Sequence, residues 1–206
     1  MIQTYSTTIR RKEMDAVLTC MVDEKIGPGE LNARLIQQVK EFFRCDGAVA
    51  LRSPAIALDY ALKSMNLEEG SKVMISALAP LWQYQTLKTL GFEPEVLDVN
   101  DSNGLVSVEE IKTGIENGGK VLLLHETEGI VPNFDEILEL GVQVIEDVSM
   151  SAGASVALSE DYLLAVKGSN DKSIVENRKK VGSYGVYTIL GLEERDVITA
   201  GGGAVL

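Results

Sequence analysis

The 206-residue chain has few of the residues that build metal centres or disulfide frameworks. It contains two cysteines, Cys20 and Cys45, which do not form a CxxC pair, and a single histidine, His125. Two isolated thiols predict reduced side chains, and a lone histidine without further ligands gives little support for metal binding or histidine-based catalysis. We therefore expect no metal centre and no redox chemistry at cysteine.

Long apolar runs and an excess of positive charge are also missing. The first fifteen residues are polar and charged, and apolar runs elsewhere are only a few residues long, so we expect neither a membrane span nor a signal peptide, and a cytoplasmic location. The formal net charge of −12 argues against nucleic acid or an anionic membrane as the main partner. The one basic cluster, 178–180, is short and more typical of a solvated loop.

What the chain does contain is a regular alternation of short Val/Ile/Leu runs with amphipathic stretches. This alternation predicts βαβ units around a mainly parallel sheet, hence an α/β fold. Strands are expected at 48–51, 72–76, 94–99, 120–125, 142–148, 186–190 and 203–206. Helices are expected at 30–44, 54–65, 82–90, 107–117 and 133–140.

Residues 1–206 are expected to form one domain with two less regular parts. One is the N-terminal segment 1–29, and the other is 156–180, where a short apolar piece and a polar run predict an insertion or flexible loop. The chain ends inside a predicted strand, and from this we expect a truncated gene product.

Residues directly after the predicted strands are the candidate ligand contacts, because open α/β sheets bind ligands at the carboxyl ends of their strands. Ser53 is either a helix N-cap or a phosphate contact, and Trp82 is either a core residue or a surface for ring stacking. Asp147, at the end of a buried strand, is either solvated or paired with a cation such as a protonated ring nitrogen. Glu146 should face the opposite side of the sheet.

Several segments together resemble one protein family in order and spacing. They are "IGPGELNARLIQQVKEFF" (26–43), "AVALRSPAIALDYAL" (48–62), "EPEVLDV" (93–99), "VLLLHETEG" (121–129), "VIEDVSMSAGA" (144–154), "VGSYG" (181–185) and "TAGGGAV" (199–205). The chain resembles the DegT/StrS family of pyridoxal-phosphate-dependent sugar aminotransferases. This implies the large domain of aminotransferase fold type I: a seven-stranded, mostly parallel sheet with one antiparallel strand and helices on both faces. The C-terminal small domain is expected to be absent.

The resemblance also implies cofactor contacts, and some have changed. Asp147 falls on the aspartate that pairs with the pyridine nitrogen of the cofactor. Ser53 falls on the serine of the phosphate turn, but Pro54 and Ala55 replace the glycine and threonine that follow it in the family. The backbone donor of that glycine and the hydroxyl of that threonine are therefore lost.

Other positions around the cofactor ring have changed too. Pro80 stands where the family has the stacking aromatic residue, and Trp82 is a potential substitute. Met150 replaces a glutamine near the ring hydroxyl, and Ala152 replaces a histidine.

The largest departure from the family is at the lysine that forms the Schiff base. Counting forward from "VGSYG" puts Asp196 at that position, and counting back from "GGGAV" puts Arg195 there; neither side chain can form an imine. Lys179 and Lys180 lie before the preceding strand and are poor replacements, and Lys167 and Lys172 lie in the insertion, which would have to fold back to reach the site. We therefore expect no covalent cofactor, although residual non-covalent pyridoxal phosphate would be compatible with Asp147.

Two functional hypotheses follow. The first is a degenerate, non-catalytic homologue that acts in binding, regulation or assembly in sugar or polysaccharide biosynthesis. The second is an active aminotransferase acting on a keto sugar nucleotide, completed by a partner chain. Under either hypothesis the resemblance implies a homodimer or a pairing with a paralogue, and the strand carboxyl ends would suit a small anionic ligand.

Overall fold

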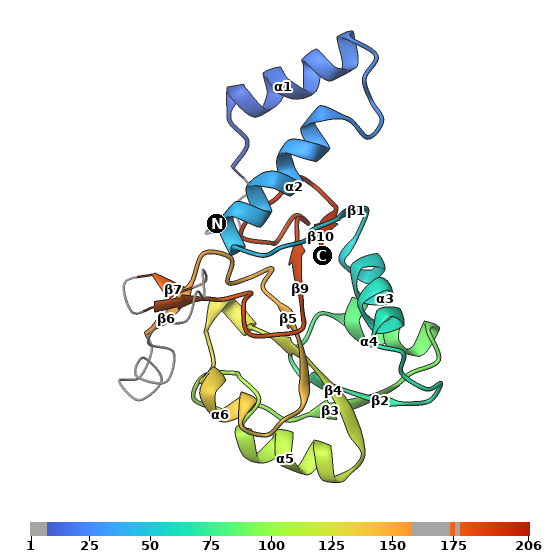
Figure 1. Cartoon of the computed structure of the whole chain (residues 1–206), viewed down its shortest axis with the longest axis vertical. Coiled ribbons are helices and arrows are strands. Elements are labelled where there is room, and N and C mark those ends of the chain that lie inside the picture. Colours follow the sequence, from blue (N-terminus) through green and yellow to red (C-terminus); the bar gives the residue numbers. More distant parts are fainter. Residues whose placement is uncertain (1–7, 158–173, 176–177) are drawn as a thin grey trace, which may run out of the picture.

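The computed structural model of the chain describes residues 8–157, 174–175 and 178–206, and a seven-stranded sheet forms its centre (Figure 1). The strand order is β1 (Ala50–Leu51), β10 (Ala204–Val205), β9 (Tyr187–Gly191), β5 (Gln143–Asp147), β4 (Gly119–His125), β2 (Lys72–Ser76) and β3 (Glu93–Leu97). β10 pairs antiparallel with both neighbours, and every other pairing in the sheet is parallel. The predicted mostly parallel sheet with one antiparallel strand is confirmed.

Helices cover both faces of this sheet, as expected. On one face, α3 (Pro54–Ser64) and α4 (Leu81–Thr89) pack on Val73, Val121 and Ile145. On the other face, α2 (Glu30–Phe43), α5 (Val108–Glu116) and α6 (Phe134–Leu138) pack on residues that include Leu122 and Val144. Since neighbouring strand residues face opposite sides, Asp147 shares the α3/α4 face with Ile145, while Glu146 lies on the other face.

Local sequence signals explain where the helices begin. The Ser53 hydroxyl accepts a hydrogen bond from the Ile56 amide at 3.3 Å, and Pro54 occupies the first helical position of α3. The Ser107 hydroxyl likewise accepts from the Glu110 amide at 3.2 Å at the start of α5. Ser53 therefore caps α3, which is one of the two roles predicted for it.

Two parts of the chain differ from the prediction. A helix, α1 (Arg11–Val22), forms within the segment 1–29, and a three-stranded sheet of β6 (Ser155–Ala157), β8 (Arg178–Lys180) and β7 (Ile174–Val175) takes up parts of the range 155–180. The rest of the predicted insertion, 158–173 and 176–177, lies outside the described residues.

The basic cluster 178–180 is the central strand of this small sheet, so its prediction as a solvated loop is wrong. The strand alternation turns Lys179 inward, where its ammonium lies 4.6 Å from the centre of the Tyr184 ring. Lys180 on the other side donates to the Phe42 carbonyl at 2.7 Å. The Tyr184 ring and the Phe42 carbonyl therefore hold the ammonium groups of Lys179 and Lys180, which the sequence alone predicted to be solvated.

Both cysteines are free. Within the described residues there is no cluster of three or more potential metal ligands. None of the helices in the described parts of the chain is long and apolar enough to cross a membrane. A short 3-10 turn, η1 (Thr127–Gly129), follows β4 and leads to the site described next.

Candidate functional site

A pocket of about 450 Å³ lies at the carboxyl ends of β4 and β5, the position expected for an open α/β sheet. His125 and Asp147, the last residues of these two strands, form its floor. Trp82 and Met150, both predicted as site residues, lie in its wall. After β2, the Ser76 hydroxyl accepts from the Leu78 amide at 3.1 Å and shapes the turn that leads into α4.

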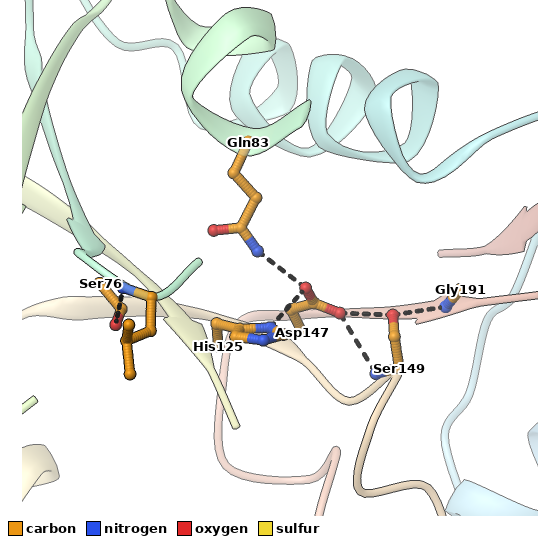
Figure 2. Close-up of polar contacts among 7 residues, drawn as sticks. Ser76, Gln83, His125, Asp147, Ser149 and Gly191 are labelled. Carbon is orange, nitrogen blue, oxygen red and sulfur yellow. Dashed lines mark hydrogen bonds and ion pairs between the residues drawn. The ribbon is translucent and has the colours of Figure 1, made fainter. Parts of the chain in front are cut away.

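Asp147 is at the centre of a hydrogen-bond network, which Figure 2 shows. Its Oδ2 accepts from the Gln83 side-chain amide at 2.7 Å and lies 3.1 Å from His125 Nδ1. Its Oδ1 accepts from the Ser149 hydroxyl at 2.5 Å and from the Ser149 backbone amide at 3.2 Å. The carboxylate is fully buried.

These contacts fill the acceptor positions of the Asp147 carboxylate. A carboxylate has about four lone-pair sites, and four donors point at this one. Burial alone would raise the pKa of Asp147, but the hydrogen bond and charge of His125, with the bonds from Ser149, bring the pKa below its ordinary value. Asp147 is therefore a buried, ionised acceptor whose partners all come from this chain.

The wall opposite α4 contains the two residues that the alignment placed at the Schiff-base lysine. Arg195 and Asp196 both line the pocket. Asp196 Oδ2 accepts from the Glu193 amide at 2.6 Å, and burial, with the nearby charges of Asp147 and Glu193, raises the pKa of Asp196. A carboxyl group therefore lines the pocket at one of the two positions that the resemblance assigned to the lysine.

Gly191, the last residue of β9, makes room for this arrangement. Its amide donates to the Ser149 hydroxyl at 2.9 Å, and a Cβ at this position would meet the same hydroxyl at 2.6 Å and would clash with Asp196 Oδ2. The strand, the Asp147 network and Asp196 are therefore packed against one another with no space for a side chain at 191.

The charge of the pocket lining is mostly negative. Five acidic side chains contribute to it, against one arginine. Three of them, Glu128, Glu193 and Glu194, lie near the rim, and the other two are Asp147 and Asp196. No lysine is among the described residues of the lining. These charges do not favour the small anionic ligand that the sequence analysis expected here.

The remaining predicted site residues are placed less centrally. Pro54 lines the pocket, but Ser53 and Ala55 do not, and the Ser53 hydroxyl is engaged as the cap of α3. Lys179 belongs to the small sheet. Lys167 and Lys172 lie outside the described residues.

Sequence reasoning missed Gln83 and Ser149, which complete the Asp147 network. Gln83 is fully buried, one helical turn before the buried Leu87 on the inner face of α4. A polar residue at a core position of a helix is a signal that could have identified it. Ser149 stands two residues after Asp147, the spacing at which an aspartate accepts from the following backbone.

Two glutamates occupy the opposite side of the sheet. Glu146 accepts backbone hydrogen bonds from Gly182, Tyr184 and Gly185 at 2.5–2.7 Å, so it fixes the loop before β9. Glu126 is fully buried directly after β4, and burial raises its pKa to about 8. Glu146 and Asp147, the two carboxylates at the end of β5, therefore face opposite sides of the sheet and have different hydrogen-bond partners, as the alternation of the strand predicted.

The fold is that of the large domain of type I aminotransferases. The chain matches an aminotransferase from Psychrobacter cryohalolentis with a TM-score of 0.80 and 20% identity, over 98% of this chain and 48% of that one. It matches the PLP form of Spr1654 from Streptococcus pneumoniae with a TM-score of 0.77 and 16% identity, over 99% of this chain and 52% of that one.

The sequence comparison gives the family. The model of the DegT/DnrJ/EryC1/StrS aminotransferase family matches residues 7–206, so the chain belongs to this family. A curated relative, GDP-perosamine synthase from Vibrio cholerae, is 20% identical over 211 residues, covering 100% of this chain and 52% of the relative. The chain spans about half the length of the relatives that it matches.

Proposed function

We propose that this chain is a non-catalytic member of the family, acting in binding, regulation or assembly in sugar-nucleotide or polysaccharide biosynthesis. The family and its relative GDP-perosamine synthase support the connection to sugar nucleotides. The observation that supports a non-catalytic role is the Asp147 network, in which donors of the chain itself occupy the acceptor positions that the ring nitrogen of a cofactor would need.

Pyridoxal phosphate, the cofactor that the family implies, does not fit the residues present. A protonated pyridine nitrogen would have to displace Gln83, His125 or Ser149 from a buried carboxylate, and breaking such a charge-assisted bond costs about 1.5–3 kcal/mol. The phosphate would meet a mostly acidic wall, and Pro54 has no backbone donor to offer it.

Covalent attachment is opposed by a separate feature. Imine formation needs a primary amine in the pocket, and the alignment puts Asp196 or Arg195 where the family has its lysine. A carboxyl group forms no imine, and an arginine stays protonated. The loss of the amine and the occupation of Asp147 are independent, so a single reversion would not restore both.

Chemical trapping tests this proposal. The purified chain is incubated with pyridoxal phosphate, reduced with borohydride, and digested for peptide mass spectrometry that covers every lysine, including Lys167 and Lys172. We expect only the low, scattered labelling of surface lysines that the same chain shows in urea. A stoichiometric adduct on one lysine, lost on unfolding, would refute the proposal and favour the active aminotransferase.

We also propose that the chain works as an assembly, either a homodimer or a pair with a longer paralogue. The support is the length comparison: relatives that match this chain are about twice as long, so about half of each relative has no counterpart in the matched residues. Recovery of the tagged chain from its host cells as a monomer, with no second copy and no family member, would contradict this.

A further inference from the structure

The pocket at the carboxyl ends of β4 and β5 is lined mainly by groups that accept hydrogen bonds. Asp196, Glu193 and Glu194 belong to one wall, and the two glutamates are exposed to solvent. Asp147 and Glu128 bring the acidic side chains of the lining to five, against one arginine. A concave site with this balance of charges attracts cations from solution.

Two buried polar atoms beside these carboxylates lack a hydrogen-bond partner among the described residues. Gln83 is fully buried, and its Nε2 donates to the floor residue Asp147, but its carbonyl oxygen Oε1 has no donor. Figure 2 shows this oxygen turned away from Asp147. The Thr127 hydroxyl oxygen, on a residue that lines the pocket, is also buried and unpartnered. Unpaired buried acceptors are costly, so both atoms point to a ligand that donates hydrogen bonds.

Trp82 adds an aromatic surface to the same pocket. It is the one tryptophan of the chain, and it is partly buried on α4. An indole ring attracts an ammonium group more strongly than the other aromatic side chains do. Carboxylates, unpaired acceptors and an indole together therefore match an organic cation.

We propose that this pocket binds a small organic cation through a primary ammonium group, which the Asp196 carboxylate and the Trp82 ring hold. A primary ammonium has three N–H donors, and these suit both the carboxylates and the unpartnered oxygens of Gln83 and Thr127. A quaternary ammonium has the charge but no N–H donor. The pocket volume of about 450 Å³ is in the range of small-molecule sites. The proposal rests on the proposed function, since it names the ligand class of a site that no longer holds the cofactor.

Titration of the full chain with the diamine putrescine, followed by tryptophan fluorescence, tests this proposal. Trp82 is the sole tryptophan, so the signal comes from the pocket itself. Putrescine is varied from about 0.01 to about 10 mM at constant ionic strength. We expect a saturable change, with isothermal titration calorimetry as the second measurement. The analogue of putrescine with both nitrogens fully methylated should bind at least about tenfold more weakly, because it donates no hydrogen bond.

A pair of variants tests the role of Asp196. Asp196→Asn should weaken putrescine binding at least about tenfold, because it removes the charge and keeps an oxygen that can accept from the Glu193 amide. The matched control is Glu109→Gln, which removes one carboxylate from an exposed position of α5 and should leave the affinity unchanged. Circular dichroism checks that both variants remain folded.

The results separate this inference from the proposed function. Absence of saturable binding in both fluorescence and calorimetry overturns the inference, and so does unchanged affinity in Asp196→Asn. Equal affinity for the methylated analogue overturns the assignment of a primary ammonium. Borohydride trapping is performed without putrescine, so a stoichiometric adduct there would refute the proposed function. No adduct and no putrescine binding would together refute this inference alone.

Discussion

The buried glutamate after β4 predicts an unusual dependence of stability on pH. Glu126 is fully buried, and neither of its carboxyl oxygens has a hydrogen-bond partner in good geometry among the described residues. Burial raises its pKa from 4.5 to about 8, the nearby Ser151 hydroxyl lowers it in part, and the charges of Glu146 and Asp147 raise it further. At neutral pH this carboxyl group therefore keeps its proton in the folded chain.

The sign and size of the effect follow from linkage. The folded chain holds a proton that the unfolded chain releases, so the stabilising contribution is complete below pH 4.5 and is lost as the pH rises toward 8. Each pKa unit corresponds to about 1.4 kcal/mol, which makes the total loss across this window about 4–5 kcal/mol. A marginally stable domain has about 5–15 kcal/mol in all, so the effect is large enough to measure.

The assay is urea unfolding of the chain and of Glu126→Gln at pH 5, 6, 7 and 8. The amide cannot ionise, so the variant should lose less stability as the pH rises, and it should be the more stable protein at pH 8. Glu116→Gln, at an exposed position of α5, is the matched control and should follow the original chain. Equal slopes for the original chain and Glu126→Gln would refute a protonated Glu126.

Three further predictions concern the packing around the site. Glu146→Ala should lower the free energy of unfolding by at least about 1–3 kcal/mol in urea titrations, because the amides of Gly182, Tyr184 and Gly185 lose their acceptor; an unchanged midpoint would contradict this. Gly191→Ala should cost about 1–3 kcal/mol, since its Cβ would meet the Ser149 hydroxyl, whereas Gly27→Ala has open space and should be nearly neutral. Gln83→Leu should cost about 1–3 kcal/mol by leaving Asp147 short of one donor. Because a hydrogen bond donated to the ionised carboxylate favours that form, the loss should shrink at acid pH as Asp147 takes up a proton, and a loss independent of pH would argue against the network.

Much of the fold could be predicted because its strands and helices carry local patterns. The apolar runs at β2, β4 and β5 and the Ser-Pro and Ser-x-x-Glu starts of α3 and α5 are visible without any long-range information. The small sheet was missed because its inward lysine is held by Tyr184, a residue of a later loop. α1 was missed because none of its residues is buried among the described parts of the chain, so no core-facing pattern marks it.

The position of the site could be predicted from the sequence, but the hydrogen bonds within it could not. Asp147 could be identified from the strand end and from the family resemblance. One of the hydrogen bonds that fill the acceptor positions of Asp147 comes from Gln83, which is 64 positions earlier and reaches the carboxylate only through the packing of α4 on the sheet. The acidic lining likewise comes from three segments that the fold brings together, so no local pattern contains it.

Titration of the purified chain with pyridoxal phosphate, followed by absorbance, tests the central claim most directly. If Asp147 is already saturated by internal donors and no amine lines the pocket, the mixture will show no saturable new absorbance band, and gel filtration will return a colourless protein. A saturable new absorbance band that remains with the protein after gel filtration would contradict the account.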